Sequence, residues 1–403
     1  AVLAGGRLGD SFGYRRVFLW GVAGFTLASA ACGLARSAEE LVAARLLQGA
    51  AGAVMSPQAL ALLQVLFEPL ERVRKLALFG LVGGLASIAG PILGGLLIKA
   101  NLFGLGWRLV FLINLPVGLM ALLSGWRFLP DRRSGRPAGF DAGGMALFGA
   151  AVLALLWPLT RFEAGWRGRE WTCLAMALPL AWWGWRHIAA RVAARRPALF
   201  DPTLLAIRPF RLGLLLSVAF AAANAGFLLS FAFALQTERH QTPLDTGLLH
   251  MPFGLGAMLG IAVLGRTFLP RFGKWVMVAG GMAMLLATAL VLIGIGALAL
   301  PLAALVPLLL LSGTGMGALS GCIMPVAVAQ VDNDHAGAAS GLLKTAQQVG
   351  GALGIALAGS TYFAWDMTLG LPPSSGVVLV IATLLAMSIA LALRLPEQIF
   401  APR

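Results

Sequence analysis

The first loop of the chain places one acid among several cations, between glycines that permit a tight turn. Asp10 is able to pair with the neighbouring arginines or to lie against the positive N-terminal end of a helix. The simpler alternative is a short polar hairpin between two helices. The residues of interest in this loop are Gly6, Asp10, Gly13, Arg15 and Arg16.

A second unusual residue is Arg45, which lies about one turn inside a long apolar run. An arginine at such a depth in a membrane is costly unless it faces a cavity or a partner. Gln48 and Gly49 follow it at helical spacing. The alternative is that the Arg45 side chain extends back to the membrane interface.

Glycines and a proline are combined in the next apolar run. Gly90 and Gly94 are four residues apart and therefore lie on one helix face, where they allow close approach of another helix. Pro91 removes an internal hydrogen bond and bends the helix, and Gly95 follows. Packing alone would explain the glycines, whereas packing combined with a bend at one level favours a gate.

Weakly polar and aromatic residues within the apolar runs are typical of a pocket for a flat lipophilic guest. They are equally compatible with ordinary filling between membrane helices. The candidates for a substrate cavity are Met55, Gln58, Asn114, Asn224, Phe227, Phe231 and Gln347.

Catalytic motifs are missing from the sequence, which has no HExxH, GxSxG, P-loop or Asp-rich metal motif. Its three cysteines are widely spaced in apolar runs without a nearby histidine, which excludes a disulfide framework and a zinc ribbon. The four histidines are scattered singly. We therefore expect no enzyme, no cofactor and no metal site.

Composition defines the elements that must position these residues. Of 403 residues, 59% are hydrophobic and only 11% are charged, with a mean hydropathy of +0.87. A soluble globular protein carries roughly 25% charged residues, so the chain is predicted to be a polytopic membrane protein. Twelve apolar stretches are long enough to span a bilayer: roughly 17–35, 41–63, 76–98, 108–129, 141–160, 171–187, 212–236, 244–264, 275–298, 301–323, 337–363 and 376–394.

The 30 lysines and arginines indicate how these spans are oriented. Counted over alternate gaps, about three times as many lie on the side of the first loop as on the opposite side, which predicts that the first loop and the C-terminus are cytoplasmic. Because the cations lie in short loops, the formal net charge of +14 does not indicate a nucleic-acid partner. The lipid bilayer is the expected partner.

Similar residues also recur in the chain at an offset of about 260 residues, as in the parallel repeats of a transporter. Gly5, Phe12 and Gly21 correspond to Gly265, Phe272 and Gly281, although chance matches are an alternative in a chain with 51 glycines. We predict an incomplete N-terminal bundle at 1–129, a linker with two extra spans at 130–209 and a C-terminal bundle at 210–403.

Taken together, these runs resemble the major facilitator superfamily over essentially the whole chain. The first loop looks like its signature loop, the run from Arg45 to Gly49 resembles its fourth-helix motif, and Gly90 to Gly95 is similar to the antiporter motif of its fifth helix. The two linker spans resemble those of the fourteen-span drug:proton antiporter-2 family. Three further runs also resemble that family: Trp107 to Gly118, Ser340 to Leu343 and Gln348 to Gly351.

The resemblance implies an all-α integral membrane protein with two six-helix bundles and two linker spans. The first span and part of the second are expected to be missing in front of Ala1. It further implies a multidrug efflux permease of the bacterial inner membrane that exports lipophilic or cationic compounds by alternating access, driven by proton influx. The alternative is a transporter of the same fold for a defined metabolite such as an amino acid, siderophore or sugar. Whether a periplasmic accessory protein takes part is left open.

Carried over by residue, the resemblance assigns three roles. Asp10 would lock the inner side through a helix end in the other half, Arg45 would lie near the proton path, and Gly90, Pro91 and Gly94 would set the gate. Ser11 departs from the family pattern, which usually has a basic residue there, and this change weakens the expected lock. No acid lies clearly in the middle of a span, so the proton-carrying acid is expected on the missing first span.

Overall fold

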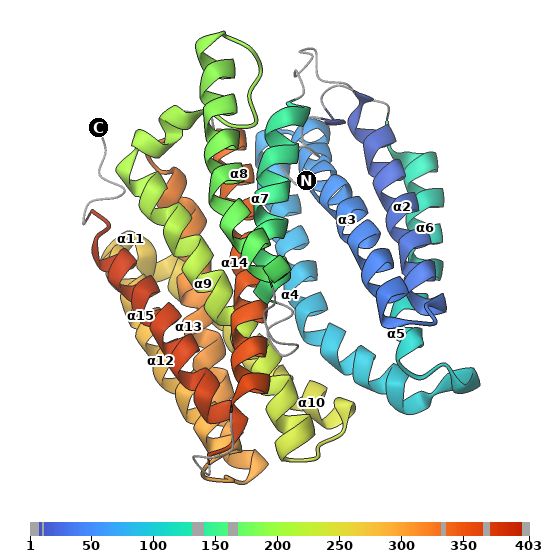
Figure 1. Cartoon of the computed structure of the whole chain (residues 1–403), viewed down its shortest axis with the longest axis vertical. Coiled ribbons are helices and arrows are strands. Elements are labelled where there is room, and N and C mark those ends of the chain that lie inside the picture. Colours follow the sequence, from blue (N-terminus) through green and yellow to red (C-terminus); the bar gives the residue numbers. More distant parts are fainter. Residues whose placement is uncertain are drawn as a thin grey trace. The chain divides into compact units, whose positions relative to one another are not determined.

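The computed structural model describes residues 8–9, 12–130, 141–159, 168–331, 336–365 and 371–396. Over these ranges the regular structure is helical and contains no strand (Figure 1). A helix satisfies its backbone hydrogen bonds within one segment, as an apolar environment requires. The chain divides into two compact units: unit 1 comprises residues 1–146 and 187–199, and unit 2 comprises 147–186 and 200–403. The division therefore falls within the predicted linker.

Unit 1 is built on a tightly packed pair of helices, α2 (Tyr14–Leu34) and α3 (Ala38–Leu66), to which α6 (Asn114–Phe128) adds. Ser37 caps α3 by accepting a hydrogen bond from the backbone N–H of Glu40, and two acids occupy the first turn of that helix. Its other helices are α4 (Pro69–Ala100), η1 (Leu102–Gly104), η2 (Gly106–Arg108) and α5 (Leu109–Leu112). Asn101 ends α4 in the left-handed conformation, with φ of 41°.

Two linker helices, α7 (Ala142–Leu159) and α8 (Gly168–Ala193), each run through the division between the units. Both contain a proline, Pro158 and Pro179, without interruption of the helix. α8 carries Glu170 in its first turn and Arg191 in its last, where each charge complements the helix dipole.

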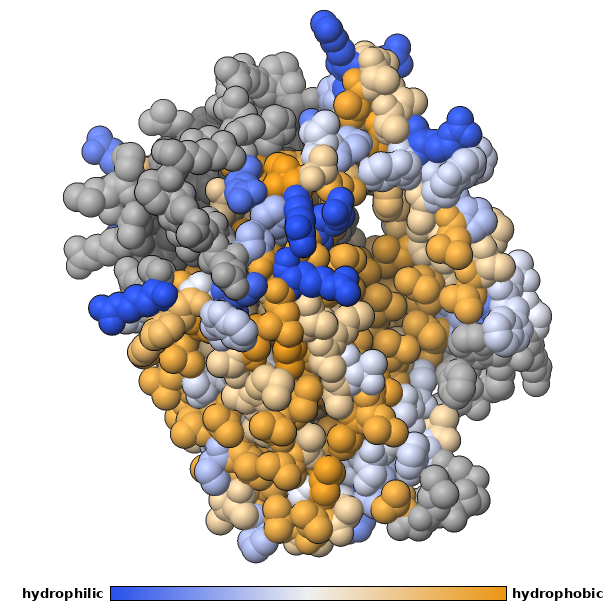
Figure 2. All heavy atoms as spheres, turned by 90° about the vertical axis from the view of Figure 1, so that its left-hand side faces the viewer, coloured by the Kyte–Doolittle hydropathy of each residue, from blue (hydrophilic) through white to orange (hydrophobic). Residues whose placement is uncertain are grey.

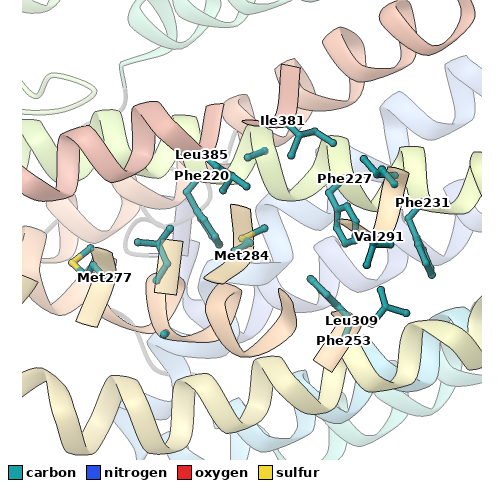
Figure 3. Close-up of a cluster of buried hydrophobic side chains, with 14 of the residues drawn as sticks. Phe220, Phe227, Phe231, Phe253, Met277, Met284, Val291, Leu309, Ile381 and Leu385 are labelled. Atoms are coloured by element: carbon teal, nitrogen blue, oxygen red, sulfur yellow. The ribbon is translucent and has the colours of Figure 1, made fainter. Parts of the chain in front are cut away.

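Unit 2 holds the larger core of the chain. Its elements are η4 (Pro202–Ala206), α9 (Arg208–Phe233), η5 (Ala234–Glu238), α10 (Pro243–Leu259), η6 (Gly260–Phe268), α11 (Leu269–Phe272), α12 (Lys274–Ile295), α13 (Leu302–Val328), α14 (Ala336–Ala364) and α15 (Pro373–Leu393). Both η5 and η6 are π-helical. Figure 3 shows side chains of this core, to which α9, α12 and α15 contribute residues such as Phe227, Met284 and Leu385.

Close helix contacts in unit 2 depend on glycine. A Cβ atom at Gly354 of α14 would lie 1.9 Å from the carbonyl oxygen of Ala222 on α9, and one at Gly313 of α13 would lie 1.9 Å from that of Phe253 on α10. No side chain fits at such separations, so backbones meet directly, as they do at small-residue contacts between membrane helices.

Each of the twelve predicted spans coincides with a helix or a continuous helical run, with ends that differ by a few residues. Nine of the helices within the described ranges are long and apolar enough to cross a membrane. Of the helices at the other three predicted spans, α8 and α14 carry charged or amide side chains such as Arg186 and Lys344 that lower their hydropathy, and α4 includes the shorter apolar stretch Ile88–Ala100. Figure 2 shows apolar side chains covering much of one face, with hydrophilic ones gathered toward one end.

Candidate functional site

Arg45 belongs to a hydrogen-bonded group in unit 1 that we call the Arg45 cluster, formed by Ser29, Cys32, Arg45, Gln48 and Asn114. Nη1 of Arg45 donates to Oε1 of Gln48 at 2.7 Å, and Nε2 of Gln48 donates to Oγ of Ser29 at 2.9 Å. Nδ2 of Asn114 donates to the same Ser29 oxygen at 3.0 Å. The Cys32 thiol lies 3.9 Å from Oε1 of Gln48. Three helices, α2, α3 and α6, thus meet in one polar chain.

The centre of the Arg45 cluster is buried, and close helix packing fixes it. Ser29 is 0% exposed and Gln48 3% exposed. The Ser29 hydroxyl donates a hydrogen bond to the carbonyl oxygen of Phe111 at 3.0 Å. One turn from Ser29 the helices approach closely, since a Cβ atom at Gly118 of α6 would lie 2.0 Å from Oγ1 of Thr26. Such a satisfied network in an apolar setting orients its members firmly.

Arg45 itself is exposed at the edge of the cluster. Its guanidinium lies 5.6 Å from the centre of the Phe111 ring, a separation at which cation and ring attract one another. Among the described residues no carboxylate pairs with it. The positive charge is therefore held by an amide oxygen and a ring face, which leaves it able to attract an anion or to sense the protonation of a distant acid.

Of the predicted cavity residues, Asn114 belongs to the Arg45 cluster, to which it is bound through Ser29. Met55 lies where α3 meets α2, because a Cβ atom at Gly21 would lie 2.8 Å from the Met55 Cβ atom. Gln58 is fully buried farther along α3, and its Nε2 donates to the carbonyl oxygen of Val54 at 3.3 Å. Their part in a substrate cavity stays a prediction.

The expected gate segment lies in the second half of α4, which continues through Pro91 to Ala100. Gly90 and Pro91 are exposed, whereas Gly95 is buried. A Cβ atom at Gly90 or Gly94 would meet no described atom within 4 Å. This glycine face is therefore open within the described part of unit 1. Its function as a gate stays a prediction.

The predicted lock loop is described only in part, since Gly6 and Asp10 lie outside the described residues. Gly13 has φ of 96°, which a residue with a side chain adopts only with strain, and it precedes the first residue of α2. Arg15 donates to the carbonyl oxygen of Trp126 near the C-terminal end of α6, where a cation complements the helix dipole. Arg16 is exposed.

The cavity candidates of unit 2 lie in different surroundings. Phe227 and Phe231 are 0% and 2% exposed and pack with Phe253 in the apolar core, with the Phe227 and Phe253 ring centres 5.6 Å apart (Figure 3). In this arrangement they fill the core rather than line an open wall. Asn224, one turn earlier on α9, is half-buried, and its Oδ1 atom has no hydrogen-bond partner among the described residues. Gln347 of α14 is also half-buried.

A polar group that the sequence did not indicate surrounds Glu238, the last residue of η5. Its Oε1 atom accepts from the Tyr362 hydroxyl at 2.8 Å and from the backbone N–H of Ser374 at 3.0 Å. Its Oε2 atom accepts from the Ser374 hydroxyl at 2.8 Å. We call Glu238, Tyr362 and Ser374 the Glu238 clamp, because they join the ends of α9, α14 and α15. In the sequence, the acid Glu238 just beyond the end of a predicted span was the available signal.

A second group that sequence reasoning missed lies at the start of α7. Asp141 is 1% exposed and accepts from Nε2 of His187 at 2.8 Å and from the backbone N–H groups of Gly144 and Leu199 at 2.9 and 3.0 Å. Arg191 lies 3.6 Å away. Burial by itself raises the pKa of the Asp141 carboxyl, but these hydrogen bonds and the charge of Arg191 outweigh burial and hold that pKa below its ordinary value.

Comparison with known proteins decides the family. The sequence pattern of the Major Facilitator Superfamily matches residues 1–355. The chain belongs to the major facilitator superfamily. The chain is 36% identical over 371 residues to the "Probable actinorhodin transporter" of Streptomyces coelicolor, a match that covers 90% of this chain and 63% of that protein. It is also 36% identical over 363 residues to the "Tetracenomycin C resistance and export protein" of Streptomyces glaucescens, covering 89% of this chain and 65% of that protein.

A third relative is the "Multidrug resistance protein Stp" of Mycobacterium tuberculosis, 30% identical over 385 residues, covering 90% of this chain and 66% of that protein. The chain therefore spans just under two thirds of the length of these curated relatives.

Solved structures confirm the fold of this superfamily member. A peptide transporter of the POT family matches with a TM-score of 0.64 at 15% identity, covering 99% of this chain and 84% of that one. The nucleoside transporter NupG matches with a TM-score of 0.59 at 14% identity, covering 99% and 87%. The predicted all-α membrane fold is confirmed, and the chain is a multi-pass membrane protein of a transporter family.

Proposed function

We propose that the protein to which this chain belongs is a proton-coupled exporter of lipophilic or cationic compounds. The observation that carries the proposal is the similarity, over about nine tenths of the chain, to proteins named for the export of antibiotics or for resistance to them. Because the chain spans just under two thirds of these relatives, the activity is proposed for the whole protein.

The Arg45 cluster supports the proposed coupling. A cation held by an amide and a ring, with no described carboxylate beside it, responds strongly to charge elsewhere in an apolar setting. An acid that gains or loses a proton would change the balance of charge around Arg45, and with it the preferred arrangement of α2, α3 and α6. The energy source is the proton gradient, without a cofactor.

The remaining roles are proposed together with this function. Gly90, Pro91, Gly94 and Gly95 form the gate, and the loop with Asp10 forms the lock of the inner side. The two halves alternate access to a central cavity. The protein lies in the bacterial inner membrane with its C-terminus in the cytoplasm, because most lysines and arginines lie on that side. A periplasmic accessory protein is a further candidate partner.

The proposal is tested by efflux of a fluorescent lipophilic cation from bacterial cells that express the full-length protein. We expect loaded cells to lose the dye when they are energised and to retain it after a protonophore collapses the gradient. Cells with the empty vector serve as the control. Efflux that continues without the gradient would contradict proton coupling. Uptake or release of one polar metabolite, with no effect on any dye, would favour the metabolite transporter instead.

A further inference from the structure

An apolar groove of about 450 Å³ lies at the surface of unit 2, between η6, α11, α12 and α13. Its volume is in the range of small-molecule sites, roughly 300–1,000 Å³. Phe268 and Phe272 stack with ring centres 5.8 Å apart along one side. Phe272 and Trp275 are each 55% exposed, and Leu311 is 47% exposed. The groove therefore opens outward, on a face that a bilayer would cover.

The floor of this groove is closed toward the core. α12 and α13 meet there through Gly280 and Gly315, since a Cβ atom at Gly315 would lie 2.4 Å from the Gly280 carbonyl oxygen. Backbones at this separation leave no passage between the two helices. An occupant of the groove must then enter sideways from the lipid, and it cannot continue into the core of unit 2.

Two cations, Arg271 and Lys274, lie next in sequence to residues that line the groove. Arg271 and Lys274 alternate with the lining residues Phe272 and Trp275 in a single stretch of chain, and Arg271 is exposed. Nζ of Lys274 donates to the carbonyl oxygens of Leu393 and Leu395, both at 3.1 Å, and lies 6.0 Å from the centre of the Trp275 ring. Basic and tryptophan side chains at the end of a span belong at the level of lipid headgroups.

We propose that this groove binds one acyl chain of an anionic phospholipid, whose phosphate-bearing headgroup is held by Arg271 and Lys274. The apolar walls suit a hydrocarbon chain, and the charge at the mouth favours an anionic headgroup over a neutral one. The same charge repels the lipophilic cations that we propose as exported substrates, so the groove is a lipid site and not an entrance for them. In the predicted orientation the lipid belongs to the inner leaflet.

Native mass spectrometry of the purified full-length protein in detergent tests this proposal. Phosphatidylglycerol and phosphatidylcholine with identical acyl chains are added in parallel, and the lipids retained per protein are counted. We expect phosphatidylglycerol to be retained preferentially, and Arg271→Gln to lower its retention about fivefold, as the loss of one cation near a headgroup does. Arg208→Gln removes an exposed charge from the start of α9, outside the groove, and should have no such effect.

A second variant tests the groove itself. Ala283 lines it, and Ala283→Leu fills its volume, so retention of phosphatidylglycerol should fall, whereas Ala386→Leu at an exposed position of α15 should leave it unchanged. Equal retention of the two lipids would overturn the proposal, as would full retention by both Arg271→Gln and Ala283→Leu. Binding of a fluorescent lipophilic cation that Ala283→Leu abolishes would also overturn it, because the groove would then take substrate. If Ala283→Leu does not yield folded protein, the Arg271→Gln comparison decides alone.

Discussion

Arg45 and Gln48 lie one turn apart on α3, and the guanidinium of the first donates to the side-chain oxygen of the second at 2.7 Å. The side-chain amide of Gln48 donates in turn to Oγ of Ser29 on α2, which also accepts from the side-chain amide of Asn114 on α6. A cation at the edge of the membrane region is thereby joined to a buried polar chain across three helices.

Arg45→Ala should reduce dye efflux by about tenfold or more, since a hydrogen bond to a charged group contributes about 1.5–3 kcal/mol. Gln48→Leu should reduce efflux as well, because it breaks the link between Arg45 and Ser29. Initial efflux rates are measured at matched amounts of protein in the membrane. Arg36→Ala, an exposed cation before α3, is the matched control and should keep normal efflux. Normal efflux by Arg45→Ala would remove Arg45 from the transport pathway.

The Glu238 clamp should stabilise the ends of three helices of unit 2. Its carboxylate accepts three hydrogen bonds, and Glu238→Ala leaves the Tyr362 hydroxyl and the Ser374 N–H without that acceptor, at a cost of about 2–4 kcal/mol. Thermal unfolding in detergent should shift down by several degrees, and less for Glu238→Gln, which keeps one oxygen.

A double-mutant cycle with Tyr362→Phe separates the clamp from general damage at this position. The effects of Glu238→Ala and Tyr362→Phe should be less than additive, because each variant alone already breaks their shared hydrogen bond. Strictly additive shifts in the unfolding temperature would show that the contact contributes nothing.

Gly354 should be intolerant of any side chain, whereas its neighbour Gly351 should not be. A Cβ atom at Gly354 would lie 1.9 Å from the Ala222 carbonyl oxygen, but one at Gly351 would lie 3.8 Å from the Ala225 Cβ atom, which is an ordinary contact. Gly354→Ala therefore forces α9 and α14 apart and should cost at least about 1–3 kcal/mol, whereas Gly351→Ala should be close to neutral. Fluorescence-detected size-exclusion chromatography after heating compares the two. Equal heat resistance would refute the close helix contact.

Asp141 should stabilise the linker in a pH-dependent manner. Its pKa is lowered in the folded chain, so its contribution is present above the ordinary carboxyl value, near 3.9, and is lost as the pH falls through the lower folded value. Asp141→Asn should destabilise the protein, and the difference in unfolding temperature should persist from pH 8 to about 5 and shrink below about 4. Protease cleavage near residue 199 offers an independent readout. A difference that disappeared already at pH 6 would contradict this account.

The sequence predicted the spans well, because apolar length alone determines which segments cross a membrane. It also indicated Arg45, since an isolated cation in an apolar run is conspicuous. Ser29, which accepts from both Gln48 and Asn114, was missed, as was the Glu238 clamp. Such contacts join residues far apart in the chain: 85 residues separate Ser29 from Asn114 and 136 separate Glu238 from Ser374.

Phe227 and Phe231 illustrate a different limit. Membrane helices are apolar on most sides, so the periodicity of their side chains does not separate a core face from a cavity face. Only the packing of α9 against Phe253 of α10 shows that both rings are buried. Asn224 on the same helix instead has a buried oxygen with no hydrogen-bond partner in the described part of the chain, and it is the better candidate for a contact with substrate.

Proton exchange in proteoliposomes that contain the full-length protein tests the central claim most directly. A pH-sensitive dye is trapped inside vesicles with an acidic lumen, and a lipophilic cation is added outside. We predict that the cation enters and that the lumen becomes more alkaline at the same time, with both changes lost in Arg45→Ala. Entry of the cation with no movement of protons, or movement unaffected by the sign of the gradient, would contradict proton-coupled export.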